Sequence, residues 1–463
     1  MLILGYLTET GKLTPEASMK LEQAINLGYQ RLCTFEVSGG GFDWYGRAPA
    51  NVLLSAYGIL ELSDMNRVYP IDLGIVERAK AWLAGKQQEN GSWHEEHLPY
   101  SLGVTSADLM VTAYVAWALA EAGDRSPMTE RALAIVERGL RDGMDTYTLA
   151  LAANALLARD PKHPAGRACV EKLLASAQEE DHALHWVKEG RTMYYGGGEA
   201  GNVELTALVA LALARLPSES ARWFQALTWL VRHKDPQGGW HSTQATILAM
   251  KALLGGSTPK TASARAVVSL TVNGRPAGTL EVTSQNSDLL QQVDLKEHVQ
   301  RGANRVELAV AGEAPMSYQI AGRWYVPWAG VPAPVKPPVE IDVAYDKTTL
   351  AVDDTVDCTV RVRYHLDSPT YMVIVDVGIP PGFTPDPGSL AELVGQGKVD
   401  KYSQTGRQLT FYLGQVSREK PVELRYACKA RFPIRAQAPE STAYEYYNPA
   451  NRATAKPVRL EVR

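Results

Sequence analysis

Few side chains in this sequence combine the type and the spacing that catalysis or metal binding needs. His94 and His97 lie in the segment Trp-His-Glu-Glu-His-Leu-Pro, three residues apart and with no convincing third ligand. Helical zinc sites place two histidines four residues apart, so this pair does not match that pattern. A solvated loop is the favoured interpretation of both histidines, and we expect neither a metal nor a cofactor.

The four cysteines divide into two pairs with different expectations. Cys33 and Cys169 fall in helical patterns, where a free cysteine packs as a small apolar group. Cys358 and Cys428 fall in strand-like segments of one small β-region and could form a disulfide there, but the sequence does not show whether their Cβ atoms face each other. There is no Cys-x-x-Cys motif, and four cysteines are too few for a disulfide framework.

Composition indicates a soluble globular chain of several domains. The sequence has 463 residues, of which 45% are hydrophobic and 21% charged. A formal net charge of -4 gives no reason to expect nucleic acid or an anionic membrane as a partner. The apolar runs are shorter than a bilayer requires, and Met1–Leu7 lacks the basic residues of a signal peptide. Either the protein is cytoplasmic or the sequence is a piece of a longer chain.

The clearest boundary between elements lies in the segment Asp-Pro-Gln-Gly-Gly-Trp-His-Ser-Thr-Gln, which starts at Asp235. Gly238 and Gly239 predict a turn that carries Trp240, and Ser242 is a suitable N-cap for the apolar helix that follows. Thr243 and Gln244 open that helix. An inward-facing helix is the natural interpretation.

Similar turns recur about every fifty residues, which indicates a repeat architecture. Each turn precedes a helix rich in Ala, Leu and Val, and amphipathic helices alternate with these. Helices that are apolar all round belong inside and amphipathic helices outside, so the pattern predicts an α/α toroid of six inner and five outer helices, with Met1–Leu7 as a shortened inner member. Trp44, Trp93 and Trp240 are predicted to wedge between hairpins, each contributing about 2 kcal/mol. The predicted outer helices span about 14–34, 72–87, 127–141, 164–178 and 218–233.

The periodicity becomes alternating after residue 256, which indicates antiparallel β-structure. A first β-region is expected over 257–330, with a hairpin turn at Asn273-Gly274. Closely spaced prolines predict a stiff linker at 331–338. The segment 339–463 suits a β-sandwich with one short helix near 389–394.

Several motifs, in this order, resemble the alpha-2-macroglobulin and complement family. The segment from Gly238 to Thr246 resembles the last inner-helix motif of its thioester domains. The segment from Tyr371 to Phe383 and the run Tyr-Glu-Tyr-Tyr-Asn-Pro from Tyr444 resemble its receptor-binding macroglobulin domain. Leu13-Thr-Pro-Glu and Gly28-Tyr-Gln-Arg-Leu resemble the segment that follows the thioester. The resemblance covers nearly the whole chain.

The resemblance implies an endopeptidase inhibitor that traps proteases after bait cleavage. The family thioester needs a Gly-Cys-x-Glu-Gln type motif, which this chain lacks; Lys20-Leu-Glu-Gln has Lys in place of Cys. We expect the motif upstream, in a longer extracellular or periplasmic parent whose other macroglobulin domains are partners. The region 257–330 would be the second part of a split CUB-like domain, with unpaired strand edges.

Two residue-level expectations follow from the resemblance. His97 lies in the neighbourhood where complement-type domains keep an acyl-transfer histidine, although the family spacing favours Tyr100 to Leu102. In animal inhibitors the short helix of the last domain presents lysines to a receptor. The segment Pro385 to Val394 has none, so receptor binding is not expected.

Two other classes of function stay open. The toroid pattern is similar to that of terpene cyclases and protein prenyltransferases, which would need an Asp-rich acid site or a zinc site in the toroid. The only Asp-Asp motif, Asp353-Asp354, falls in the last β-region and no zinc set is evident, so we expect no enzyme. A stand-alone interaction module is the third class.

Overall fold

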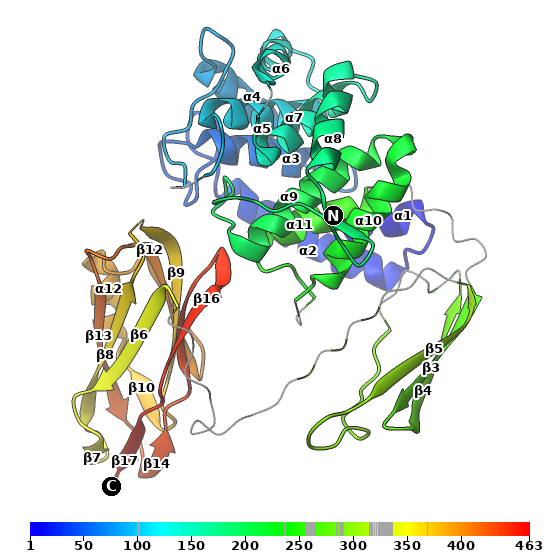
Figure 1. The fold of residues 1–463 in the computed structure, drawn as a ribbon. Coiled ribbons are helices and arrows are strands. Elements are labelled where there is room, and N and C mark those ends of the chain that lie inside the picture. Colours follow the sequence, from blue (N-terminus) through cyan, green and yellow to red (C-terminus); the bar gives the residue numbers. More distant parts are fainter. Residues whose placement is uncertain are drawn as a thin grey trace.

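The computed structural model has a helical N-terminal half, a small sheet and a C-terminal β-sandwich (Figure 1). None of the described helices is long and apolar enough to cross a membrane. The structure describes residues 1–99, 102–141, 143–235, 238–255, 265–283, 286, 291–313, 318, 320, 322, 337–367 and 369–463. The proline-rich segment 331–336, Tyr100 and Ser101 lie outside these ranges, so the expectations for them stay predictions.

The helices form two alternating sets, as the sequence predicted. Within the inner set, consecutive helices from α3 to α11 pack against one another, and α1 packs against α11. The inner helices are α1 (Leu2–Glu9), α3 (Val52–Asn66), α5 (Ala107–Glu121), α7 (Thr146–Arg159), α9 (Gly198–Ala214) and α11 (Thr243–Leu254). The outer helices are α2 (Pro15–Cys33), α4 (Leu73–Lys86), α6 (Pro127–Gly139), α8 (Pro164–Ala175) and α10 (Ser220–Arg232), which follows the 3-10 turn η1 (Pro217–Glu219).

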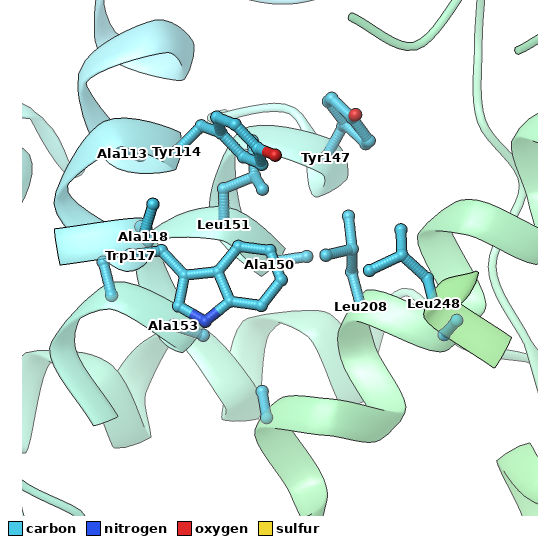
Figure 2. Close-up of a cluster of buried hydrophobic side chains, with 14 of the residues drawn as sticks. Ala113, Tyr114, Trp117, Ala118, Tyr147, Ala150, Leu151, Ala153, Leu208 and Leu248 are labelled. Carbon is cyan, nitrogen blue, oxygen red and sulfur yellow. The ribbon is translucent and has the colours of Figure 1, made fainter. Parts of the chain in front are cut away.

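Burial explains why the two sets occupy different layers. In α5 every residue from Met110 to Ala120 is buried, so this helix can lie only in the interior. In α10 the buried residues recur three or four positions apart, from Trp223 to Leu230, so one stripe faces inward and the rest meets solvent. Side chains from α5, α7, α9 and α11 meet at the toroid centre, where Figure 2 shows Leu208 between Trp117 and Leu248. The predicted α/α toroid is confirmed.

Outside the toroid core, a short hairpin of β1 (Gln178–Glu180) and β2 (Ala183–His185) packs on α10. The small sheet has the order β4-β3-β5, with β3 (Arg265–Val272) in the middle, β4 (Arg275–Thr283) and β5 (Val306–Glu313). Asn273 and Gly274, at φ 51° and 77°, make the predicted hairpin turn. Four buried side chains form its core, so most of the sheet surface is exposed.

The C-terminal sandwich packs two main sheets over one core. Their orders are β10-β13-β8-β6 and β11-β12-β9-β15-β16, and a third set, β14-β17-β7, contains a short parallel pair. The strands are β6 (Val339–Tyr345), β7 (Thr349–Leu350), β8 (Thr355–Tyr364), β9 (Thr370–Gly378), β10 (Phe383–Pro385), β11 (Lys401–Gln404), β12 (Gln408–Val416), β13 (Val422–Ala430), β14 (Ile434–Gln437), β15 (Ser441–Glu445), β16 (Asn448–Ala455) and β17 (Arg459–Val462). The predicted short helix is α12 (Pro387–Gly395).

Cys358 and Cys428 do not form the disulfide that their strand positions left open. They lie on the neighbouring strands β8 and β13, and all four cysteines are free thiols. Cys358 is opposite Tyr426, so Cys428 is displaced from it by two positions. Such a diagonal neighbour is about 7–8 Å away, beyond the Cα separation of most disulfides.

Thiol labelling should separate these cysteines by burial. Burial raises the pKa of Cys358 and of Cys169 to about 11 and also raises that of Cys428. Because the thiolate is the reactive form, we expect a neutral-pH thiol reagent to modify only Cys33 rapidly in the native protein. The same reagent should count four thiols after denaturation. Rapid native labelling of Cys358 or Cys428 would contradict the buried core described here.

Candidate functional site

The turn before α11 is fixed by a tryptophan anchor. Trp240 is buried, and its Nε1 donates to the carbonyl of Leu230 at 2.6 Å. Its backbone N–H donates to Thr246 Oγ1 at 3.0 Å, which joins the turn to α11. Gly238 has a φ of 88°, a conformation that favours glycine, and the Gly239 N–H donates to Asp235 Oδ1 at 2.9 Å. The predicted turn therefore connects outer helix α10 to inner helix α11 through one tryptophan, whose indole contacts α10 and whose backbone contacts α11.

Two other tryptophans make the same two contacts. The indole N–H of Trp93 donates to Leu83 in α4 at 2.8 Å, and that of Trp186 donates to Leu173 in α8 at 2.7 Å. The backbone N–H of each donates to a threonine on the following inner helix: Thr112 for Trp93 and Thr206 for Trp186. Trp93, Trp186 and Trp240 are thus the anchors of three repeats.

The structure corrects the prediction that Trp44 is a wedge. Trp44 is 41% exposed, whereas the nearby Phe42 is buried and its backbone N–H donates to Ser55 on α3. The glycine-turn pattern does not reveal Trp186, because His185 and β2 precede it and no glycine marks its turn. The separation of Trp93 and Trp186 along the sequence is close to two repeat lengths, and this spacing could have identified Trp186.

Four of the inner helices begin with a side-chain cap, and α9 does not. Asn51, Ser106, Asp145 and Ser242 cap α3, α5, α7 and α11 with their own side chains. Helix α9 follows Gly197, which has no side chain for this purpose. The Gly197 N–H instead donates, at 3.4 Å, to the carbonyl of Tyr447 in the sandwich. The sandwich therefore satisfies a backbone group at the start of α9.

An ion pair joins the toroid to the same part of the sandwich. Arg191, in the loop before α9, lies 3.2 Å from Oε1 of Glu445, and this carboxylate is buried. Glu445 also accepts from the hydroxyl of Tyr364 at 2.8 Å and from the side-chain amide of Asn451 at 2.8 Å. Three donors thus hold one carboxylate at the boundary between the two domains.

Aromatic contacts extend this boundary around the turn of the β15–β16 hairpin. The ring of Tyr195 stacks on that of Tyr447, with centroids 5.7 Å apart. The hydroxyl of Thr243, the first residue of α11, lies 3.1 Å from the Tyr446 hydroxyl. The starts of α9 and α11 therefore meet the hairpin together. We name this contact, formed by Arg191, Tyr195, Gly197 and Thr243 with Glu445, Tyr446 and Tyr447, the docking contact.

Removal of the ion pair should weaken the docking contact. In the variant Arg191→Met, Glu445 keeps two hydrogen-bond donors but loses its cation. We expect the free energy that stabilises the docking contact to fall by about 2 kcal/mol. Hydrogen exchange of the peptide that contains Tyr446 and Tyr447 should become faster. Arg435→Met is the control, because Arg435 is exposed and pairs with Glu461 at the surface of the same sandwich. Equal exchange in both variants would show that the pair contributes nothing to docking.

Beneath the docking contact, the toroid centre holds a polar network in an apolar core. The hydroxyl of Tyr147 donates to Glu204 Oε1 at 2.8 Å, and the Thr192 hydroxyl donates to Oε2 at 2.9 Å. Burial raises the pKa of Glu204 to about 7, although these hydrogen bonds oppose the shift. The Tyr194 hydroxyl donates to that of Tyr114 at 3.0 Å. A cavity of about 10 Å³ remains among these side chains.

Gln244, on α11, lines this cavity. Nearby, a buried ion cluster joins α3 to α11. Lys251 Nζ lies 2.8 Å from Glu61 Oε1 and 2.8 Å from Asp64 Oδ2. Burial lowers the pKa of Lys251, but the two carboxylates outweigh it, so the net shift is upward. The cluster therefore stays charged and connects α11 to α3.

The histidines singled out in the sequence lie on an exposed loop. His94 Nδ1 is 2.7 Å from Asp108 Oδ1, and this hydrogen bond raises the pKa of His94. The side chain of His97 is 75% exposed, 3.6 Å from Glu95. Among the described residues, no group of three His, Cys, Asp or Glu side chains could hold a metal ion. Glu95 itself was missed: it is buried, and Oε2 accepts from the Val52 N–H at the start of α3.

Family comparisons agree with the order of the domains. Residues 1–255 match the A-macroglobulin TED domain, and residues 368–457 match the A-macroglobulin receptor binding domain. The chain belongs to the alpha-2-macroglobulin family. It is 23% identical over 490 residues to ovostatin of Gallus gallus, covering 99% of this chain and 32% of the relative. It is 23% identical over 440 residues to alpha-2-macroglobulin-like protein 1 of Mus musculus, covering 90% of this chain and 29% of the relative.

Solved alpha-2-macroglobulins of bacteria share the fold. Native alpha-2-macroglobulin of Escherichia coli, from domain MG7 to the C-terminus, matches with a TM-score of 0.66 and 17% identity, over 99% of this chain and 70% of that one. Salmonella alpha-2-macroglobulin reacted with methylamine matches with a TM-score of 0.64 and 15% identity, over 97% of this chain and 28% of that one. This chain spans about a third of the length of the two curated alpha-2-macroglobulin relatives named above.

Proposed function

We propose that the chain is the C-terminal part of a broad-spectrum endopeptidase inhibitor that traps proteases. The observation that supports this most is the sequence of two family domains, TED and receptor binding, within one chain. The parent would be extracellular or periplasmic, with proteases and its own upstream macroglobulin domains as partners. We assign 1–256 to the toroid, 257–330 to a partial CUB-like region, 331–338 to a linker and 339–463 to the sandwich.

In this proposal the docking contact forms one wall of the reactive site. The starts of α9 and α11 meet the β15–β16 hairpin there, and the turn from Gly238 to Gln244 holds α11 in place. The chain has no Gly-Cys-x-Glu-Gln motif, so the thioester would come from the segment of the parent that precedes Met1. His97 is exposed on its loop and stays a proposed acyl-transfer residue.

The toroid centre does not favour the enzyme alternatives. A terpene cyclase or prenyltransferase needs a pocket that can hold an isoprenoid. Pockets that bind small molecules usually have a volume of roughly 300–1,000 Å³. The cavity among the central side chains is about 10 Å³, near the lower limit for one water molecule. We therefore propose that the toroid centre is not the active site of such an enzyme.

Chemistry of the parent chain tests the proposal. Attack of a small primary amine on a thioester forms an amide with the glutamine acyl group and releases the cysteine as a thiol. We expect the native parent to release one thiol per chain on treatment with methylamine, and to contain Gly-Cys-x-Glu-Gln shortly before Met1. A parent with the motif but without thiol release would lack an intact thioester. A parent without the motif would remove the thioester from the proposal.

A further inference from the structure

Glu204 is a buried carboxyl group in the middle of an apolar helix. Its residue exposure is 1%, and none of the ion pairs among the described residues includes it. The two hydroxyl groups of Tyr147 and Thr192 are its hydrogen-bond partners. Ionisation therefore places a negative charge in a buried site without a paired cation, which is costly.

The charged groups around Glu204 form no ion pair with it among the described residues. The positive charge of Lys188 lowers the pKa of Glu204 and so opposes the effect of burial, but its ammonium group donates to the backbone carbonyls of Leu102 and Glu189. Across the cavity, Lys251 is already paired with Glu61. The polar and titratable groups around Glu204 are Tyr147 from α7, Tyr114 from α5, Lys188 and Thr192 from the loop before α9, and Tyr57, Glu61, Tyr194 and Lys251, which line the same cavity.

The loop that covers Glu204 is also the loop that binds the sandwich. The Gly196 N–H donates to Thr192 Oγ1 at 3.0 Å, and a methyl group at Gly196 would lie 3.0 Å from Glu204 Oε2. The loop backbone therefore rests directly on the carboxyl group. The neighbouring residues Arg191, Tyr195 and Gly197 provide most of the docking contact.

We propose that Glu204 is a proton-linked switch that loosens the docking contact when its carboxyl group ionises. With the sandwich docked, the loop seals the site and favours the neutral acid. Release of the loop would let water reach the carboxyl group and favour its charged form. Docking is then fully stable below the pKa of the released state and is lost progressively as pH rises through the pKa of the docked state.

The effect is measurable because the two states bind the proton differently. Burial raises the pKa of docked Glu204 to about 7. For each pH unit by which the pKa of docked Glu204 exceeds that of released Glu204, the docking equilibrium constant changes about tenfold. Between pH 5.5 and 8.5, we expect hydrogen exchange at Tyr446 and Tyr447, corrected for the intrinsic pH dependence, to rise about tenfold or more in the full chain.

Variants distinguish the switch from a structural role. Glu204→Gln keeps the shape of the neutral acid and should give corrected exchange that does not change with pH. Tyr147→Phe removes a donor to the carboxylate, so the midpoint of the wild-type profile should move to higher pH. Glu171→Gln, at an exposed position of α8, should leave the profile unchanged. A flat wild-type profile, or the same profile in wild type and Glu204→Gln, would overturn the proposal, and neither result depends on protease trapping.

Discussion

The variant Trp186→Ala is expected to lower the free energy of unfolding of the toroid by about 3–5 kcal/mol. Trp186 is 1% exposed, and its indole N–H donates to the carbonyl of Leu173. The substitution removes this bond and leaves a large cavity between α8 and α9. Urea unfolding, followed by the circular dichroism of the helices, measures the change.

Trp44→Ala is the matched control for this prediction. Trp44 lies beside a Gly-rich turn, and the sequence pattern predicts a wedge there, but the side chain is 41% exposed. Surface substitutions of this kind usually change stability by about 0.5 kcal/mol or less. If the two variants were equally destabilised, the repeat contacts described for Trp186 would not explain the stability of the toroid.

The variant Lys251→Met is expected to destabilise the toroid by about 3–5 kcal/mol as well. The side chains of Lys251 and Glu61 are 10% and 7% exposed, so the substitution leaves a buried carboxylate without its cation. Asp64 loses the same partner. Because the cluster joins α3 to α11, ring closure should be the property affected, and the urea unfolding curve measures it.

Two further variants make this result specific. Lys20→Met breaks a pair with Glu16 in which both side chains are about three-quarters exposed, and it should change stability by less than about 0.5 kcal/mol. Adding Glu61→Gln to Lys251→Met removes the unpaired charge and should restore part of the loss. A double variant no more stable than Lys251→Met alone would show that lost packing, and not the unpaired carboxylate, causes the effect.

Local sequence patterns predicted the elements well for identifiable physical reasons. The inner helices are buried on every side, so they read as apolar runs, and Ser242 supplies a cap that marks where α11 starts. The β-strands alternate buried and exposed residues, as in β8. These signals arise within one element, which is why a single sequence contains them.

Contacts between elements left weaker signals or none. Arg191 and Glu445 are 254 positions apart, and no local pattern connects them. At the start of α9, the Gly197 N–H donates to the backbone carbonyl of Tyr447 in another domain, a contact that composition cannot reveal. Glu204 did leave a signal, since it is the one charged residue in a run from Val203 to Leu213 that is otherwise apolar except for Thr206. An acidic residue in a helix buried on all sides is energetically costly, which makes it a candidate for a functional role.

Inhibition of an endopeptidase by the native parent chain, measured with a large protein substrate and a small peptide substrate, tests the central claim most directly. A trap encloses the protease without blocking its active site. We therefore expect the protease to lose activity toward the protein substrate and to keep activity toward the peptide. Retention of both activities would contradict an inhibitory function, and loss of both would indicate active-site blockade instead of trapping.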